Sequence, residues 1–160
     1  MAELTELTIQ PRPLTLSPEE QELLIAELGA LTGALPPDRT QPYLALAQAA
    51  QTGTIPSAQI PLLESVLELV LGSGRVRHDH RAEGERLLMA LYKRTARGQA
   101  ADAALAHVNT ALAVLQGHKV TKVEATCRVP GNYSLTLDTE TLHLQLTLDA
   151  RGIRIEKTAI

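Results

Sequence analysis

The residues of this chain that are best suited to chemistry lie close together, between positions 72 and 98. The stretch reads GSGRVRHDHRAEGERLLMALYKRTARG, and two imidazoles, those of His78 and His80, flank the carboxylate of Asp79. Imidazole and carboxylate groups bind metal ions, and two histidines at a spacing of two can reach one ion when they lie on a strand. Several cations follow, so the same stretch could also contact phosphates or form the solvated side of a helix.

The residues around His78 and His80 argue against a metal site. Three leucines between positions 87 and 91 indicate that a helix follows the histidines. If the histidines are already helical, their rings lie about 200° apart around the axis and cannot share an ion. If they precede the helix, Asp79 is an N-cap whose carboxylate accepts hydrogen bonds from free backbone amides. His78 and His80 are therefore only weak metal candidates, and we expect no metal or other cofactor.

The cations of the same stretch form a basic face on the predicted helix. On a helical wheel they fall within about 100° of one another, opposite a stripe of leucines. This set is Arg86, Lys93, Arg94 and Arg97. Such a face is solvated, docks on acids of the same chain or of a partner, or contacts phosphates. Arg75 and Arg77 precede the helix and could add to these basic contacts.

Acidic residues within the chain offer these cations a partner. Residues 1–74 contain two cations and nine acids, whereas residues 75–160 contain thirteen cations and nine acids. Glu64 and Glu68 lie one helical turn apart and repel each other mildly, so a nearby cation would stabilise them. The charge asymmetry between the halves indicates either that they attract each other within one fold or that the basic half contacts nucleic acid.

No sequence motif points to catalysis. The chain has no G-x-S-x-G, no phosphate-binding P-loop and no G-x-G-x-x-G. Cys127 falls on the inward side of a predicted strand, where a thiol behaves as a small apolar side chain. With no Phe or Trp and three Tyr, the chain also has few rings on which bases could stack. We therefore expect a protein that is not an enzyme.

Compartment and membrane association follow from the cysteine count and the hydropathy. A single cysteine cannot form an intramolecular disulfide, and the opening residues lack the charged and apolar regions of a secretory signal. The most apolar stretch, residues 60–71, contains two glutamates and is shorter than the ~20 residues of a membrane span. The sequence thus predicts a cytoplasmic protein without membrane contact.

Helical signals occupy residues 17–117. Ser17 begins the first helix as an N-cap, followed by a proline and by Glu20 in a capping box, and Gly33 ends it. The other helices are expected over residues 43–51, about 56–71, 79–97 and 100–116. The third is apolar on nearly all sides, which is typical of a helix in the middle of a bundle.

After residue 117 the apolar residues recur at every second position. Four such runs, at 123–129, 135–137, 142–148 and 153–155, are separated by short turn-like connectors. They predict a four-stranded antiparallel meander within residues 119–158 whose apolar face the helices cover. We therefore expect an α+β fold, with a bundle of about five helices packed on one face of the sheet. Residues 17–160 would form one domain, with a helical layer over 17–117, and residues 1–16 an extended arm or edge strand.

Three hypotheses for function follow. The first is a non-enzymatic cytoplasmic interaction or regulatory protein that binds a protein partner or itself through the basic helix, residues 79–97. The second is a nucleic-acid-associated protein in which the same helix contacts phosphates. The third is a metal-dependent enzyme centred on His78 and His80.

Overall fold

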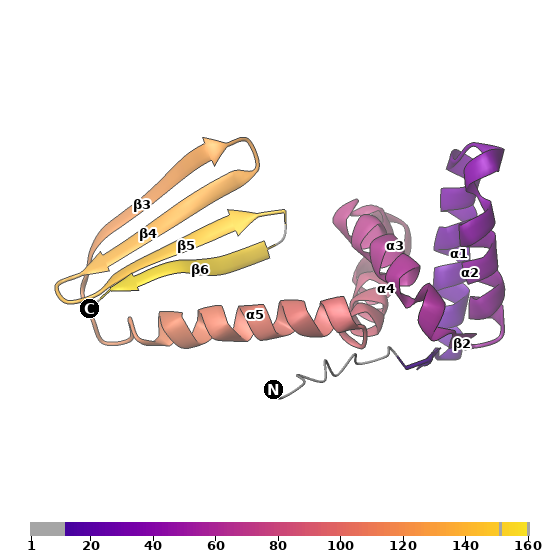
Figure 1. The fold of residues 1–160 in the computed structure, drawn as a ribbon, viewed down its shortest axis with the longest axis horizontal. Coiled ribbons are helices and arrows are strands. Elements are labelled where there is room, and N and C mark those ends of the chain that lie inside the picture. Colours follow the sequence, from indigo (N-terminus) through magenta and orange to yellow (C-terminus); the bar gives the residue numbers. More distant parts are fainter. Residues whose placement is uncertain (1–11, 151, 160) are drawn as a thin grey trace, which may run out of the picture. The chain divides into compact units, whose positions relative to one another are not determined.

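A computed structural model describes residues 12–150 and 152–159 of the chain, which divides into two compact units, residues 1–98 and residues 99–160. In this part of the chain, five α-helices precede a four-stranded antiparallel sheet (Figure 1). The α+β class predicted from the sequence is confirmed. No helix among the described residues is both long enough and apolar enough to cross a lipid bilayer.

Unit 1, residues 1–98, is a helical bundle with one short pair of strands. Its helices are α1 (Pro18–Ala34), α2 (Gln41–Gln51), α3 (Ile60–Gly72) and α4 (Arg75–Lys93). The strands β1 (Leu14–Thr15) and β2 (Thr54–Ile55) pair antiparallel, and single 3-10 turns precede α2 and α3. The end of the predicted N-terminal arm thus forms β1, while residues 1–11 of that arm lie outside the described residues.

The start of α1 follows the predicted capping box. The Ser17 hydroxyl accepts a hydrogen bond from the backbone N–H of Glu20 at 3.2 Å, and the Glu20 carboxylate accepts one from the backbone N–H of Ser17 at 2.8 Å. Two backbone amides that the helix leaves without partners are thereby satisfied.

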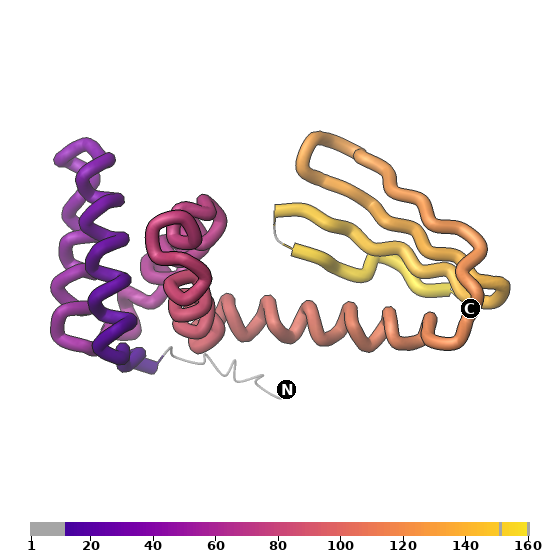
Figure 2. Tube along the Cα trace, turned by 180° about the vertical axis from the view of Figure 1, so that it is seen from behind, coloured from indigo at the N-terminus to yellow at the C-terminus, as the bar shows by residue number. Residues whose placement is uncertain are grey.

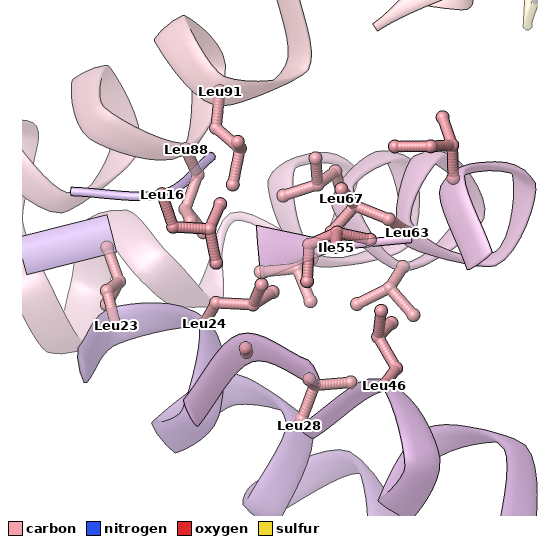
Figure 3. Packing of buried hydrophobic residues seen from close by; sticks show 14 of the residues in the cluster. Leu16, Leu23, Leu24, Leu28, Leu46, Ile55, Leu63, Leu67, Leu88 and Leu91 are labelled. Atoms are coloured by element: carbon pink, nitrogen blue, oxygen red, sulfur yellow. The ribbon is translucent and has the colours of Figure 1, made fainter. Parts of the chain in front are cut away.

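Leucines of all four helices of unit 1 meet in its core (Figure 3). Leu24, Leu46, Leu63 and Leu88 come from α1, α2, α3 and α4 in turn, and all are fully buried. Helix α3 buries several of its sides, as its apolar sequence predicts. Close packing of this kind fixes how α1 and α4 lie against each other, and that placement positions the charged residues described below.

Helix α4 differs from the predicted helix of residues 79–97. It begins at Arg75, bends at Arg81, where φ is 58° and ψ is −168°, and ends at Lys93. The bend brings its two segments together at Gly84, where a Cβ would lie 2.5 Å from the Cβ of His80. The next helix, α5 (Ala96–Ala113), begins only three residues after α4 ends.

Unit 2, residues 99–160, contains most of α5 and the sheet. The strands β3 (Val120–Val129), β4 (Asn132–Thr139), β5 (His143–Asp149) and β6 (Gly152–Ala159) pair in sequence order, as predicted. Both views show α5 running along the sheet (Figures 1 and 2). Its Val108 is buried with Leu144 and Leu146 of β5, and further apolar residues of α5, β4 and β6 surround them.

The buried apolar residues form two separate clusters, one of α1–α4 with the short strands and one of α5 with the sheet. Of the leucines predicted to point into the helices, Leu142, Leu144 and Leu146 are buried and Leu148 is exposed. Whether the chain behaves as the predicted single domain depends on whether the two units unfold together, and this stays a prediction.

Candidate interaction surfaces

Arg94, from the predicted basic face, is held by an acid of α1. Its guanidinium lies 2.6 Å from both carboxylate oxygens of Glu20, and its Nη1 donates to the carbonyl of Thr15 at 2.9 Å. The Glu20 side chain is only 10% exposed, whereas that of Arg94 is 43% exposed. The capping-box glutamate therefore also joins α4 to α1.

Arg97 is held by the two acids of α3. Its backbone N–H donates to Glu64 Oε1 at 2.9 Å, and its guanidinium lies 3.3 Å from Glu64 Oε2 and 3.2 Å from Glu68 Oε2. Glu64 is buried. The expectation that Glu64 and Glu68 attract a cation is confirmed, and the cation comes from the same unit.

Tyr92 completes the polar contacts around Glu68. Its hydroxyl donates to Glu68 Oε1 at 2.9 Å. Burial of the ring disfavours the charged phenolate, and the hydrogen bond and charge of Glu68 add to this effect, so the pKa of Tyr92 rises to about 12. The neutral phenol is thus the form that the fold stabilises.

Among the other predicted basic residues, Arg75 binds a buried acid and the rest lie among exposed groups. Arg75 forms an ion pair with Glu27, a buried acid of α1. Arg77 lies 3.3 Å from Glu85, and Arg86 lies 2.9 Å from Glu83 with both side chains exposed to solvent. Lys93, at the end of α4, is exposed too.

Three cations of the basic stretch, Arg75, Arg94 and Arg97, thus bind acids of α1 and α3 within unit 1. That use corresponds to one of the three roles that the sequence leaves open for the basic face, docking on acids of the same chain. Contact between this face and a partner stays a prediction. Such a contact would depend mainly on more exposed cations such as Arg77 and Arg86, whose side chains are 72% and 78% exposed.

The two candidate metal-binding histidines face different partners. Both lie in the first helical segment of α4, before the bend. His78 Nδ1 lies 2.8 Å from the carboxylate of Asp79, and His80 Nε2 lies 3.5 Å from Glu27. The hydrogen bond from His78 is the main reason that the pKa of Asp79 is lowered. The described residues contain no group of three His, Cys, Asp or Glu side chains that could hold a metal ion.

A groove of about 320 Å³ runs between α1 and α4. One face of each helix lines it, with residues spaced at intervals of three and four. The lining residues are Glu19, Glu22, Leu23 and Ala26 of α1 and His80, Glu83, Gly84 and Leu87 of α4. The groove combines an apolar floor with an acidic rim, and the sequence alone did not indicate it.

The sheet has a polar face and an apolar face. A shallow hollow of about 350 Å³ on the polar face is lined by Thr126, Arg128, Asn132, Ser134, Gln145, Thr147 and Glu156. On the apolar face, Val123 of β3 lies opposite Leu137, and Cys127 lies opposite Tyr133. This alternation agrees with the pattern read from the sequence.

Among the described residues of unit 2, helix α5 covers only part of the apolar face. Every residue of β3 is exposed, including Val123 at 62%, and Tyr133 on β4 is 50% exposed. A helix is about 10 Å wide and strands lie about 4.8 Å apart, so one helix covers about two strands. Helix α5 contacts the middle of β5 and its neighbours, and β3 lies beyond it. The prediction that Cys127 is buried is therefore wrong: it lies on the predicted face but is exposed.

Comparison with protein-family models, with curated proteins and with solved structures found no match for this chain.

Proposed function

We propose that the protein is a non-enzymatic cytoplasmic interaction protein, and that it binds a protein surface through the uncovered apolar face of the sheet in unit 2. The observation that carries the proposal is the exposure of Val123, Cys127, Tyr133 and Leu148, which share this face across three strands. A contiguous exposed apolar surface is unfavourable in water and marks sites of contact with other proteins.

The charges of unit 1 favour the sheet over the basic helix as the contact surface. A cation that already binds a buried acid must lose that bond before it can bind an acid or phosphate elsewhere. Arg94 and Arg97 are in this position, bound to Glu20 and Glu64. The residues of β3, by contrast, expose valine side chains to solvent.

Site-specific photocrosslinking in cells that produce the protein at its natural level tests the proposal. A photoreactive amino acid is placed at Val123 on the apolar face, at Thr126 on the polar face of the same strand, at Arg86 on α4, or at Ala26 in the groove. We expect adducts with other proteins at Val123 and far fewer of them at the matched control position, Thr126.

Each other outcome contradicts the proposal in a different way. Adducts at Arg86 alone would assign the contact to the basic helix, and adducts at Ala26 alone would assign it to the groove. Equal yields of adducts with other proteins at Val123 and Thr126 would mean that the apolar face is not a contact surface.

A further inference from the structure

Among the described residues, strand β3 has a partner strand on one side only, so its other backbone edge is unpaired there. It ends the sheet order β3-β4-β5-β6, and with 10 residues it is the longest of the four described strands. The N–H and C=O groups along its outer edge point away from the sheet, and such an edge pairs readily with another strand. This edge is a second binding feature of β3, distinct from its apolar side chains.

We propose that β3 pairs antiparallel with the β3 of a second copy of this chain, about a two-fold axis perpendicular to the sheet. The partner is thus a second copy, and pairing uses backbone groups of the edge rather than the face invoked above. The inference therefore goes beyond the proposed function and does not depend on it. A symmetric dimer requires that a surface be complementary to itself, and the charges of β3 meet this requirement.

The charges of β3 alternate in sign along the strand, as Lys122, Glu124 and Arg128. Lys122 and Glu124 are exposed and lie 2.6 Å apart, and Arg128 forms no ion pair with an acid among the described residues. A residue on the two-fold axis faces the same residue of the other copy. If the axis passed through Lys122 or Glu124, two like charges would therefore face each other and repel. An axis through Ala125 would place Lys122 opposite Arg128, which is also unfavourable.

Two other axes bring opposite charges together. An axis through Val123 places each Lys122 opposite the Glu124 of the other copy. An axis through Thr126 places each Glu124 opposite Arg128 and so provides this arginine with an acid. Opposite charges on directly facing residues stabilise paired strands. Shifts in the pairing of β3 with β4 at both ends leave Lys122–Cys127 in regular register. The axis through Thr126 requires the pairing to extend one residue further, to Arg128. The self-pairing is short about either axis, so the dimer is weak.

Pairing would also enlarge the apolar surface. In the eight-stranded sheet of the dimer, the two copies of β3 are the central strands, and the exposed faces of Val123 and Tyr133 from both copies form one continuous area. Each α5 remains over its own β5. The dimer would thus present one composite surface, bounded by two helices, in place of two small ones.

Sedimentation and disulfide trapping of the purified full-length chain test the inference. All trapping variants carry Cys127→Ser, which removes the native thiol. Residues on the axis face their own copies at a distance that a disulfide spans, so we expect Val123→Cys or Thr126→Cys to form dimers rapidly on mild oxidation. Ser134→Cys on β4 and Lys157→Cys on β6 are the matched controls, because neither removes a charge of β3. We expect the unmodified chain to show dimers that increase with concentration.

Charge exchange provides an independent measurement. Glu124→Lys should weaken the dimer at least several-fold, and because the side chains of β3 are exposed, we expect the exchanges to leave folding intact. The double variant Lys122→Glu/Glu124→Lys should restore it for the axis through Val123, and Glu124→Arg/Arg128→Glu for the axis through Thr126. Either restoration supports the inference and identifies the axis.

A chain that stays monomeric at all concentrations would overturn the inference, and so would a dimer that the controls trap as well as the axis positions. A monomer whose Val123 still forms adducts with another protein would leave the proposed function standing. A monomer whose Val123 forms adducts within its own chain would instead assign the β3 surface to unit 1.

Discussion

Removal of Arg94 tests whether the basic helix is a structural element of unit 1. Arg94→Met keeps the apolar stem but removes two charge-assisted hydrogen bonds of 2.6 Å to Glu20, whose side chain is 10% exposed. Breaking a fully buried ion pair costs about 3 to 5 kcal/mol, and an exposed pair about 0 to 1 kcal/mol. Since Arg94 is itself 43% exposed, we expect a loss of about 2 kcal/mol.

Arg86→Met is the matched control, because it removes the same group from α4, the helix that Arg94 directly follows. The ion pair of Arg86 with Glu83 joins side chains that are 78% and 79% exposed, one turn apart. Its loss should cost less than about 0.5 kcal/mol. Urea unfolding followed by circular dichroism measures both free energies of unfolding. Equal losses in the two variants would refute the reasoning.

The partner of Arg94 provides a second check. Glu20→Gln in the Arg94→Met background removes the unpaired charge that the single variant leaves buried. The double variant should therefore lose less free energy than the two single variants together. Additive losses would show that the two side chains do not interact.

Four further outcomes are expected. Leu144→Ala should destabilise unit 2 by about 2 to 5 kcal/mol in urea unfolding, because Leu144 is fully buried, and a loss below about 0.5 kcal/mol would remove this face from the core. In a variant that retains only Tyr92, absorbance titration should give a pKa of about 12, and Glu68→Gln should lower it; a pKa unaffected by Glu68→Gln would contradict the hydrogen bond. Since folding raises the pKa of Tyr92, the stability it contributes is present below its unfolded pKa and is lost as the pH rises through about 12. Duplex DNA should bind more weakly than ~10⁻⁵ M at physiological salt, and a tighter, steeply salt-dependent affinity would revive the phosphate hypothesis. Purified protein should contain no stoichiometric metal, and one ion per chain that is lost on substitution of His78 or His80 would revive the metal site.

Local signals in the sequence predicted most of the elements. Ser17 and Glu20 are a capping box in the structure because both partners lie within one turn and need nothing from the rest of the fold. The period of two after residue 117 likewise identified all four strands, because the connecting turns are short.

Corners between helices were harder to predict. Gly98 is a typical helix end, yet it lies in the first turn of α5, where a Cβ would collide with the backbone carbonyl of Tyr92. The Thr95 hydroxyl accepts a hydrogen bond from the Gly98 N–H, as an N-cap does. Thr95 is thus the residue from which the start of α5 could have been predicted. Nothing in the sequence marked the bend at Arg81, where a residue other than glycine takes a positive φ.

The period of two also predicted which face of each strand is apolar, but not whether another element covers that face. Val123 and Leu144 obey the same alternation and lie on the same face, yet Val123 is 62% exposed and Leu144 is buried. The difference arises because one helix is too narrow to cover four strands. This depends on how the elements pack together and not on the pattern of any one strand. For this reason the candidate contact surface lies among residues whose sequence pattern resembles a core.

The charge pattern shows the opposite case, because cations that resemble a binding surface in the sequence bind acids of the same unit in the structure. The shift from acidic to basic composition falls near residue 74, whereas the division between the compact units falls at residue 98. The acids of α1 and α3 and the cations that follow them therefore belong to one unit, where Arg75, Arg94 and Arg97 reach Glu27, Glu20 and Glu64. Attraction within one fold accounts for these three cations. A phosphate-binding role would have to rely on the exposed cations that remain, and each phosphate contact that is missing lowers both the affinity and its dependence on salt.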